Sequence, residues 1–160
     1  MKKIMVILLL ALFPSFSALA DDATKATPQD VYTLVLKGYE VLKNLGDNGL
    51  AAFNDPKGEF VYKDTYAYVM KCPSEMAAHP FAMAQLKGVD LRKFSHTEPS
   101  CQLAKNPKGG WVEYTWPKPG ETAPSRKVAF VLGVEGTSYV IVAGIFDDST
   151  KIEELNKNLR

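Results

Sequence analysis

The spacing of apolar residues predicts that the first element of the fold is a long helix. Thr27 can cap its N-terminus, Pro28 suits the first helical position and Asp30 suits the first turn. Gly46 is expected to end it. The apolar stripe of this amphipathic helix consists of Val31, Leu34, Val35, Leu42 and Leu45, with Tyr39 beside it. A shorter helical piece over residues 50–53 and a turn over residues 54–58 are expected next.

From Tyr66 onward the apolar residues recur at every second position, as they do in a strand. Tyr66, Tyr68 and Met70 share one face of this predicted strand. Residues 75–80 predict a short partner strand that ends at a proline. Residues 81–105 are expected to be irregular, with short helical turns at most.

Three further β-rich runs predict a meander over residues 111–116, 126–134 and 137–146. Pro117 ends the first run because proline has no N–H for the ladder, and Glu135-Gly136 predicts a hairpin between the other two. The last predicted element is a helix with N-cap residues in Asp147-Asp148-Ser149 and an apolar stripe of Ile152, Leu155 and Leu159. This order of elements describes an α+β domain with an antiparallel sheet.

The N-terminal stretch MKKIMVILLLALFPSFSALADD predicts a secretory signal peptide. Two lysines precede an apolar run over residues 4–13, and Ala18-Leu19-Ala20 is a small-residue cleavage site. A membrane-spanning helix needs about 20 apolar residues, which is longer than this run. We therefore expect cleavage after Ala20, export to the periplasm without a membrane anchor, and one domain over residues 21–160. Cleavage leaves 17 basic and 18 acidic residues with no basic cluster, which argues against nucleic-acid binding.

The two cysteines of the chain, Cys72 and Cys101, both lie in the exported part. In an oxidising compartment an even number of cysteines favours a disulfide. The alternative is a metal or nucleophilic site built from Cys72 and His79. The separation of 29 residues between the cysteines differs from the CxxC spacing of zinc sites, so the disulfide is the preferred interpretation.

Catalytic motifs are missing from the sequence. It contains no GxSxG, HExxH or GxGxxG and no phosphate-binding loop, and it has only two histidines. His96 lies in a polar stretch and is expected to be solvated. The chain is therefore interpreted as a non-enzyme without cofactor or metal.

Aromatic residues on the predicted strands are better candidates for function. Tyr66, Tyr68, Tyr114 and Trp116 each combine apolar surface with a polar tip, which is the lining expected of a small-ligand pocket. The same pattern is also that of an ordinary core, and for Tyr68 both interpretations stay open. Trp111 lies on the opposite face from Trp116 and is assigned to core or surface cover.

Taken in order, the motifs of the chain resemble the single Cache sensor domain of bacteria. They are FND at 53–55, YAYV at 66–69, AHP at 78–80, LKGVDL at 86–91, GGWVEYTWPKPG at 109–120, KVAFV at 127–131 and AGIF at 143–146. The resemblance implies an extracytoplasmic sensor in which a long N-terminal helix packs on a PAS-like antiparallel sheet. It also implies a pocket on that sheet for a small organic molecule, often a short carboxylate such as acetate, propionate, pyruvate or lactate.

The resemblance carries ligand contacts over to individual positions of this chain. The residues concerned are Tyr66 and Tyr68 in the YxY strand, His79 in the HP motif, Tyr114 and Trp116 in YxWPKP, and Lys127 at the start of a strand. A lysine can pair with a carboxylate, and a histidine or tyrosine can direct a hydrogen bond to it. Lys127 fits equally well as a lysine with its head in water, and His79 as a satisfied structural histidine. Arg126 alternates to the other face and is placed outside the pocket.

Two departures from the family pattern involve the cysteines. Residues 71–75 replace an Asp-x-Gly turn, and Pro99-Ser100-Cys101 stands where Asp-x-x-Gly is usual. The disulfide is therefore expected to replace the turn and to hold the irregular segment over the pocket.

The third departure is the lack of flanking transmembrane helices and signalling domains. It implies a soluble protein that presents its ligand to a separate membrane chemoreceptor or sensor kinase. A monomer is expected, because Lys37, Gly38 and Lys43 leave the outer face of the long helix ordinary. The alternative is a structural or protein-interaction module without a ligand, in which Tyr114 and Trp116 are packed core.

Overall fold

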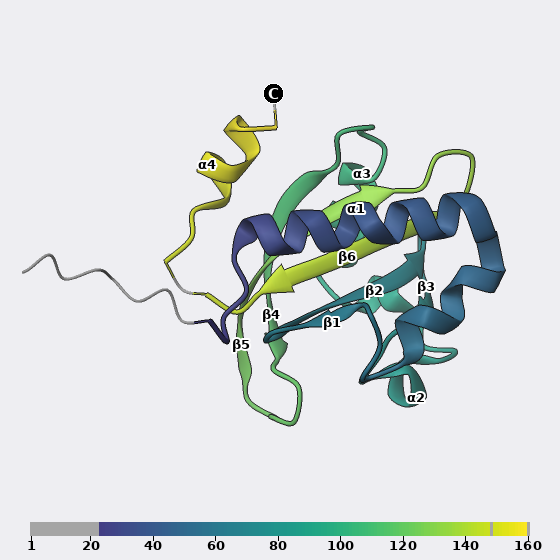
Figure 1. The fold of residues 1–160 in the computed structure, drawn as a ribbon, viewed down its shortest axis with the longest axis horizontal. Coiled ribbons are helices and arrows are strands. Elements are labelled where there is room, and N and C mark those ends of the chain that lie inside the picture. Colours follow the sequence, from purple (N-terminus) through teal and green to yellow (C-terminus); the bar gives the residue numbers. More distant parts are fainter. Residues whose placement is uncertain (1–22, 148, 160) are drawn as a thin grey trace, which may run out of the picture.

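An antiparallel sheet with a long helix across one face forms the body of the computed structural model (Figure 1). The structure describes residues 23–147 and 149–159, so the predicted signal peptide lies outside the described residues. Its helices are α1 (Pro28–Leu45), α2 (Met83–Leu86), α3 (Thr97–Leu103) and α4 (Ile152–Lys157), with 3₁₀ helices η1 (Gly46–Asn54) and η2 (Leu91–Lys93). Its strands are β1 (Val61–Tyr62), β2 (Thr65–Lys71), β3 (Glu75–Ala78), β4 (Gly110–Pro117), β5 (Pro124–Gly133) and β6 (Tyr139–Ile145).

Helix α1 begins and ends where the sequence predicts. The Thr27 hydroxyl accepts a hydrogen bond from the Asp30 N–H at 3.2 Å, and the Asp30 carboxylate accepts one from the Thr27 N–H at 2.9 Å. Gly46 ends the helix with a φ of +54° and leads directly into η1. The prediction that Leu45 belongs to the buried stripe is wrong, because its side chain is 56% exposed. The chain tightens into the 3₁₀ helix at this point, and Phe53 from η1 fills the adjoining core instead.

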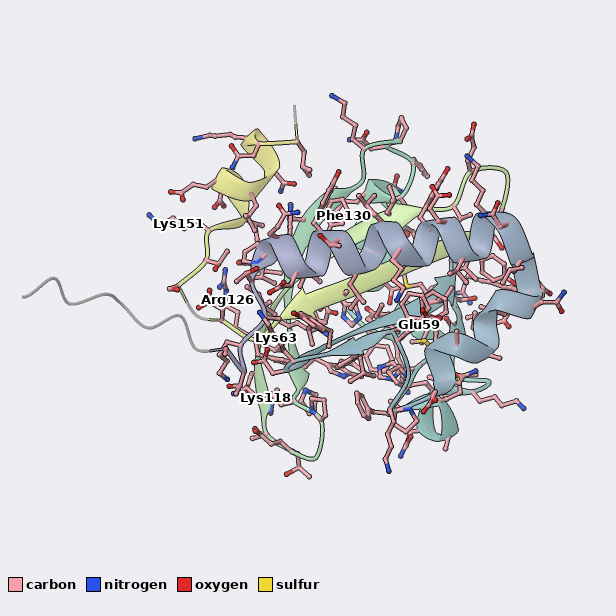
Figure 2. The ribbon with its side chains drawn as sticks, in the orientation of Figure 1. Glu59, Lys63, Lys118, Arg126, Phe130 and Lys151 are labelled. Carbon is pink, nitrogen blue, oxygen red and sulfur yellow. A yellow bond between two sulfur atoms is a disulfide. The ribbon has the colours of Figure 1, made fainter. Side chains whose placement is uncertain are left out.

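The described strands form one antiparallel sheet in the order β1-β2-β6-β5-β4, with β3 also paired to β2. The predicted meander of the last three strands is confirmed, and so is the period of two along them. On β5, Val128 and Phe130 face α1, whereas Ala129 and Val131 belong to the core cluster on the other side. Both faces are therefore covered, the second one by the segment from His79 to α3. Figure 2 shows the side chains on this fold, with Lys118 and Lys151 at its periphery.

The predicted disulfide is present between Cys72 and Cys101, with a Cα–Cα distance of 5.8 Å. It joins the end of β2 to α3. Between residue 81 and the start of α3, the chain contains only the short helices α2 and η2, as expected of an irregular region with short helical turns. This covering segment is therefore tied covalently to the sheet.

The terminal helix α4 forms as predicted, but its predicted cap is wrong. The helix begins after Lys151 without a side-chain cap. The Asp147 carboxylate instead accepts hydrogen bonds from the N–H groups of Ser149 and Thr150, at 2.8 and 3.1 Å, in the turn before the helix. Asp147 is thus engaged in a turn that lies four positions before Lys151, the residue at the N-cap position of α4.

Two side chains attach the C-terminal segment to the sheet. The Asn156 amide accepts a hydrogen bond from the Trp111 N–H at 2.9 Å and donates one to the Trp111 carbonyl at 3.1 Å. The Arg126 guanidinium donates to the backbone carbonyls of Asp147 and Thr150 and pairs with Glu113. Arg126 thus lies on the α1 face of the sheet, outside the pocket, as the sequence predicts.

Candidate ligand-binding site

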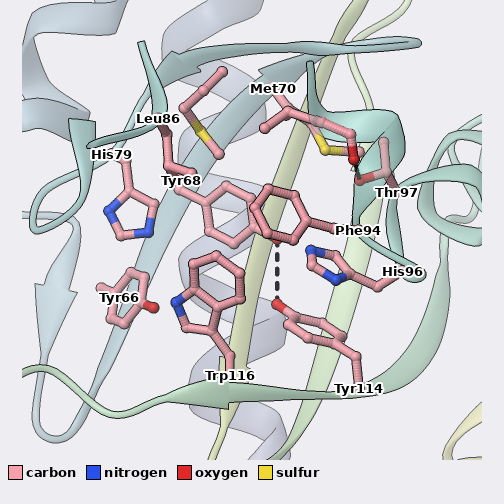
Figure 3. A pocket seen from close by; sticks show the side chains of 12 residues that line it. Tyr66, Tyr68, Met70, His79, Leu86, Phe94, His96, Thr97, Tyr114 and Trp116 are labelled. Carbon is pink, nitrogen blue, oxygen red and sulfur yellow. Dashed lines mark hydrogen bonds between the residues drawn. The ribbon is translucent and has the colours of Figure 1, made fainter. Parts of the chain in front are cut away.

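A small cavity lies on the face of the sheet opposite α1, with room for roughly one water molecule (Figure 3). Its lining comprises Tyr66, Tyr68, Met70, Met76, His79, Leu86, Leu91, Phe94, His96, Thr97, Tyr114 and Trp116. Five of the six residues predicted to bind a ligand are therefore brought together around one small space.

Two walls of the cavity come from β2 and β4, which are separated in the sheet by β6 and β5. The Tyr68 hydroxyl from β2 lies 3.2 Å from the Tyr114 hydroxyl of β4, so one donates to the other above the two strands between them (Figure 3). Between these strands, Ala129 on β5 is paired with Gly144 on β6, so the sheet carries little side-chain volume there. Small residues in the centre of the sheet thus create the space that the large aromatic residues surround.

His79 is held in one orientation and one protonation state. Its Nδ1 accepts hydrogen bonds from the N–H groups of Phe81 and Ala82, both at 3.0 Å. Burial and the nearby Lys127 lower the pKa of His79 to about 3, so the ring is neutral and its proton is on Nε2. The sequence left open whether this histidine is structural. The two hydrogen bonds to Nδ1 give this histidine a structural role, while Nε2 has no hydrogen-bond partner among the described residues.

Lys127 lies on the cavity side of β5, directly opposite Tyr114 in the sheet register. The alternative that its head lies in water is wrong, because the residue is 0% exposed. Its Nζ lies 3.9 Å from the centre of the Tyr66 ring and 5.1 Å from that of Phe146, and it has no hydrogen-bond partner among the described residues. The Tyr66 ring thus lies against the amine, and Lys127 is not itself part of the cavity lining.

Burial lowers the pKa of Lys127 to about 7. The tyrosines shift in the opposite sense, since burial raises the pKa of Tyr68 to about 12 and also raises the pKa values of Tyr66 and Tyr114. None of the twelve lining residues is acidic. At neutral pH the cavity therefore has hydroxyl, indole and imidazole donors and no negative group.

The interpretation of His96 as a solvated loop residue is wrong. Its ring stacks on Tyr114, with ring centres 4.0 Å apart and an angle of 13°, and meets Trp116 edge-on at 5.8 Å. Burial and Lys127 lower the pKa of His96 to about 4. The Thr97 hydroxyl donates to the Leu91 carbonyl at 2.7 Å and, with the disulfide, holds this segment over the sheet.

Further residues line the cavity that were not predicted from the sequence. Met70 could have been found, because it continues the face that Tyr66 and Tyr68 define. The residues of the covering segment have no period that marks them, and they are Leu86, Leu91, Phe94, His96 and Thr97. Trp111 is buried against Phe130 on the α1 face, as predicted.

Among the residues that the structure describes, two other kinds of feature are absent. No cluster of three or more His, Cys, Asp or Glu residues there could hold a metal ion. Likewise, none of the helices between residues 23 and 159 is long and apolar enough to cross a membrane.

A family model described as Cache domain matches residues 57–151. Three solved structures resemble the fold over 75% of this chain. One is described as showing carboxylic acid recognition by a Cache chemosensory domain, with 23% identity, a TM-score of 0.57 and 90% of its own length covered. A second is the periplasmic sensor domain of a chemotaxis protein, with 24% identity, a TM-score of 0.57 and 90% covered. The third is a methyl-accepting chemotaxis protein from Vibrio parahaemolyticus, with 19% identity, a TM-score of 0.59 and 88% covered.

Proposed function

The chain belongs to the Cache domain family, and we propose on this basis that it is a periplasmic sensor domain that binds a short organic carboxylate. The observation that carries the proposal is the buried amine of Lys127, which has no hydrogen-bond partner among the described residues. Burying an amine without a partner costs free energy. A carboxylate ligand would supply the missing partner.

The remaining polar groups of the site suit the same ligand. In this proposal the Nε2–H of His79 and the hydroxyl groups of Tyr66 and Tyr68 donate to the carboxylate, while Trp116 and Met70 contact its carbon chain. The cavity has room for roughly one water molecule, so its walls would have to move apart even for a small acid such as acetate, propionate, pyruvate or lactate. The Tyr66 ring would shift to let the carboxylate approach Lys127.

A surface groove gives the proposed ligand its route of entry. The groove shares Tyr66, His79 and Trp116 with the cavity and is bordered by Phe81 and by Lys118 of the loop between β4 and β5. Phe81 is 39% exposed and meets Tyr66 edge-on at 5.2 Å. Movement of Phe81 away from Tyr66 would open the cavity from this side.

Calorimetric titration of the folded, ligand-free protein with acetate, propionate, pyruvate and lactate tests the proposal. We expect at least one acid to bind, and we expect Trp116→Ala to abolish binding while circular dichroism shows an intact fold. Tyr62→Ala is the control, since this aromatic side chain is 48% exposed and lies outside the cavity. Failure of all four acids to bind would refute the proposed ligand class.

The nearly filled cavity favours a second candidate, a structural or protein-interaction module without a ligand. In that case Tyr114 and Trp116 are core residues, and Trp116→Ala unfolds the domain. Native mass spectrometry of protein taken directly from the periplasm separates the two functions, because only a binding protein carries a small molecule.

The proposal extends to the cellular setting. A signal peptide over residues 1–20 would deliver a monomer to the periplasm, where the loaded domain would act on a separate membrane chemoreceptor or sensor kinase. Mass spectrometry of the periplasmic protein should give an N-terminus at Asp21. An intact Met1 would contradict the proposed export.

A further inference from the structure

Lys127 is enclosed by groups that cannot balance a positive charge. From β2 it faces the rings of Tyr66 and Tyr68, with Nζ 3.9 and 5.6 Å from their centres, and from the end of β6 it faces Phe146. Tyr114 is its register neighbour on β4. The faces of these rings attract a cation only weakly compared with a carboxylate.

The charged and titratable groups on the other surrounding elements do not provide a counter-charge either. His79 and His96, from the segment that covers the sheet, are neutral at neutral pH. On the strand of Lys127 itself, Arg126 points to the other face and pairs with Glu113. After β6, the Asp147 carboxylate is engaged by Ser149 and Thr150. The described surroundings of Lys127 thus hold no free anion.

We propose that binding of a carboxylate ligand to this domain is coupled to the uptake of one proton by Lys127, so that the domain reports ligand concentration and pH together. This inference rests on the proposed function. In the ligand-free protein, a buried amine without a counter-ion is most stable when neutral. When the carboxylate arrives, it forms an ion pair with the amine, and the proton that completes the pair is taken from solvent.

The direction of the effect follows from linkage. The pKa of Lys127 is about 7 without ligand, and a carboxylate beside the amine raises it. Below pH 7 the amine is already protonated, so affinity is nearly independent of pH. Above pH 7 the binding of each ligand is accompanied by the uptake of one proton from solvent. Kd therefore rises by about tenfold per pH unit until the pKa of Lys127 in the complex is reached. The histidines titrate at about 3 and about 4, and burial raises the pKa values of the tyrosines above their usual range, which leaves Lys127 as the group of this site that titrates near pH 7.

The experiment is calorimetric titration with each of acetate, propionate, pyruvate and lactate at pH 6 and pH 8. Each pH is measured in two buffers that differ in their enthalpy of protonation. These acids stay ionised across this range, so any proton exchanged comes from the protein. We expect the observed heat at pH 8 to depend on the buffer with a slope close to one proton taken up, and the slope at pH 6 to be near zero.

Three variants locate the proton. Lys127→Met, which has a side chain of similar length, is expected to lose binding. His79→Gln and His96→Gln are expected to retain uptake of one proton at pH 8 even where their affinity is lower, because these histidines are neutral. Lys57→Met removes an exposed lysine and is expected to match the wild type in both affinity and proton uptake.

The possible outcomes separate the two proposals. Binding without proton uptake at pH 8, together with a Kd that is unchanged from pH 6 to pH 8, overturns the coupling and leaves the proposed function standing. Proton uptake that disappears in His79→Gln or His96→Gln also overturns it, because a histidine would then be the acceptor. Absence of binding at both pH values refutes the proposed function and the coupling with it.

Discussion

Replacing the buried amine of Lys127 by a thioether is expected to stabilise the ligand-free protein. The residue is 0% exposed, and its pKa falls from 10.5 to about 7 on folding. One pKa unit corresponds to about 1.4 kcal/mol, so the protonated lysine lowers the free energy of unfolding by ~5 kcal/mol at acidic pH and by ~4 kcal/mol at pH 7. Lys127→Met removes this cost, because methionine needs no hydrogen-bond partner in an apolar environment.

The pH dependence of this gain is specific to the mechanism. Between pH 7 and about 10.5 the unfolded chain binds a proton at this lysine that the folded protein does not bind, so wild-type stability rises with pH in this window. The advantage of Lys127→Met is therefore full below pH 7 and shrinks as the pH rises. Burial, the larger cause of the low pKa values of His79 and His96, remains in Lys127→Met, so these histidines and the other groups are expected to contribute nearly equally in both proteins.

Urea denaturation of both proteins at pH 6, 7, 8 and 9 measures this difference. With a denaturant slope of about 2 kcal/mol/M, the midpoint of Lys127→Met at pH 7 should lie roughly 2 M above that of the wild type. Lys57→Met, at an exposed lysine, should leave the midpoint unchanged. A Lys127→Met protein that is less stable than the wild type, or whose difference is the same at pH 6 and pH 9, would refute the account of a buried and unpartnered amine.

Three further predictions concern stability. Cys72→Ala/Cys101→Ala should lower the free energy of unfolding by ~3 to 4 kcal/mol in urea melts, because the disulfide spans 29 residues; wild-type protein should show no free thiol when denatured. Thr27→Ala removes the hydroxyl that accepts from the Asp30 N–H but keeps the backbone N–H bond to the Asp30 carboxylate, and it should cost about 1 kcal/mol, measured as a thermal shift against Thr33→Ala on the exposed helix surface. His96 is protonated below pH 6.5 when unfolded but only near pH 4 when folded, so acid favours unfolding; His96→Gln should weaken the loss of stability between pH 6.5 and 4, and equal slopes would contradict the burial of this ring.

The sequence was informative wherever a repeating spacing decides which way a side chain points. The period of two placed Tyr66 and Tyr68 on one face of β2, and it placed Tyr114 on one face of β4 and Trp111 on the other. Such a spacing is a property of a few neighbouring residues. It therefore survives folding even though it contains no information about the rest of the chain.

The parts that were missed depend on contacts between distant residues. His96 stacks on Tyr114 across 18 positions of sequence because the disulfide and the Thr97 hydroxyl hold its segment over the sheet. The depth of Lys127 has the same origin, since a lysine near a strand end is usually solvated unless something covers it. Side chains that line a cavity from an irregular segment leave no local pattern from which they could be predicted.

The pairing of Asn156 with Trp111 gives the small helix α4 a protective role. β4 is the last strand of the sheet order, and its outer N–H and C=O groups could recruit a strand from another molecule. The Asn156 amide occupies that edge at Trp111 as a single residue of a neighbouring strand would. A chain shortened to end before Ile152 would keep its cavity but present a bare edge, and light scattering should detect its self-association with rising concentration. Helix α4, which contributes no residue to the cavity lining, is thus expected to limit association between copies of the domain.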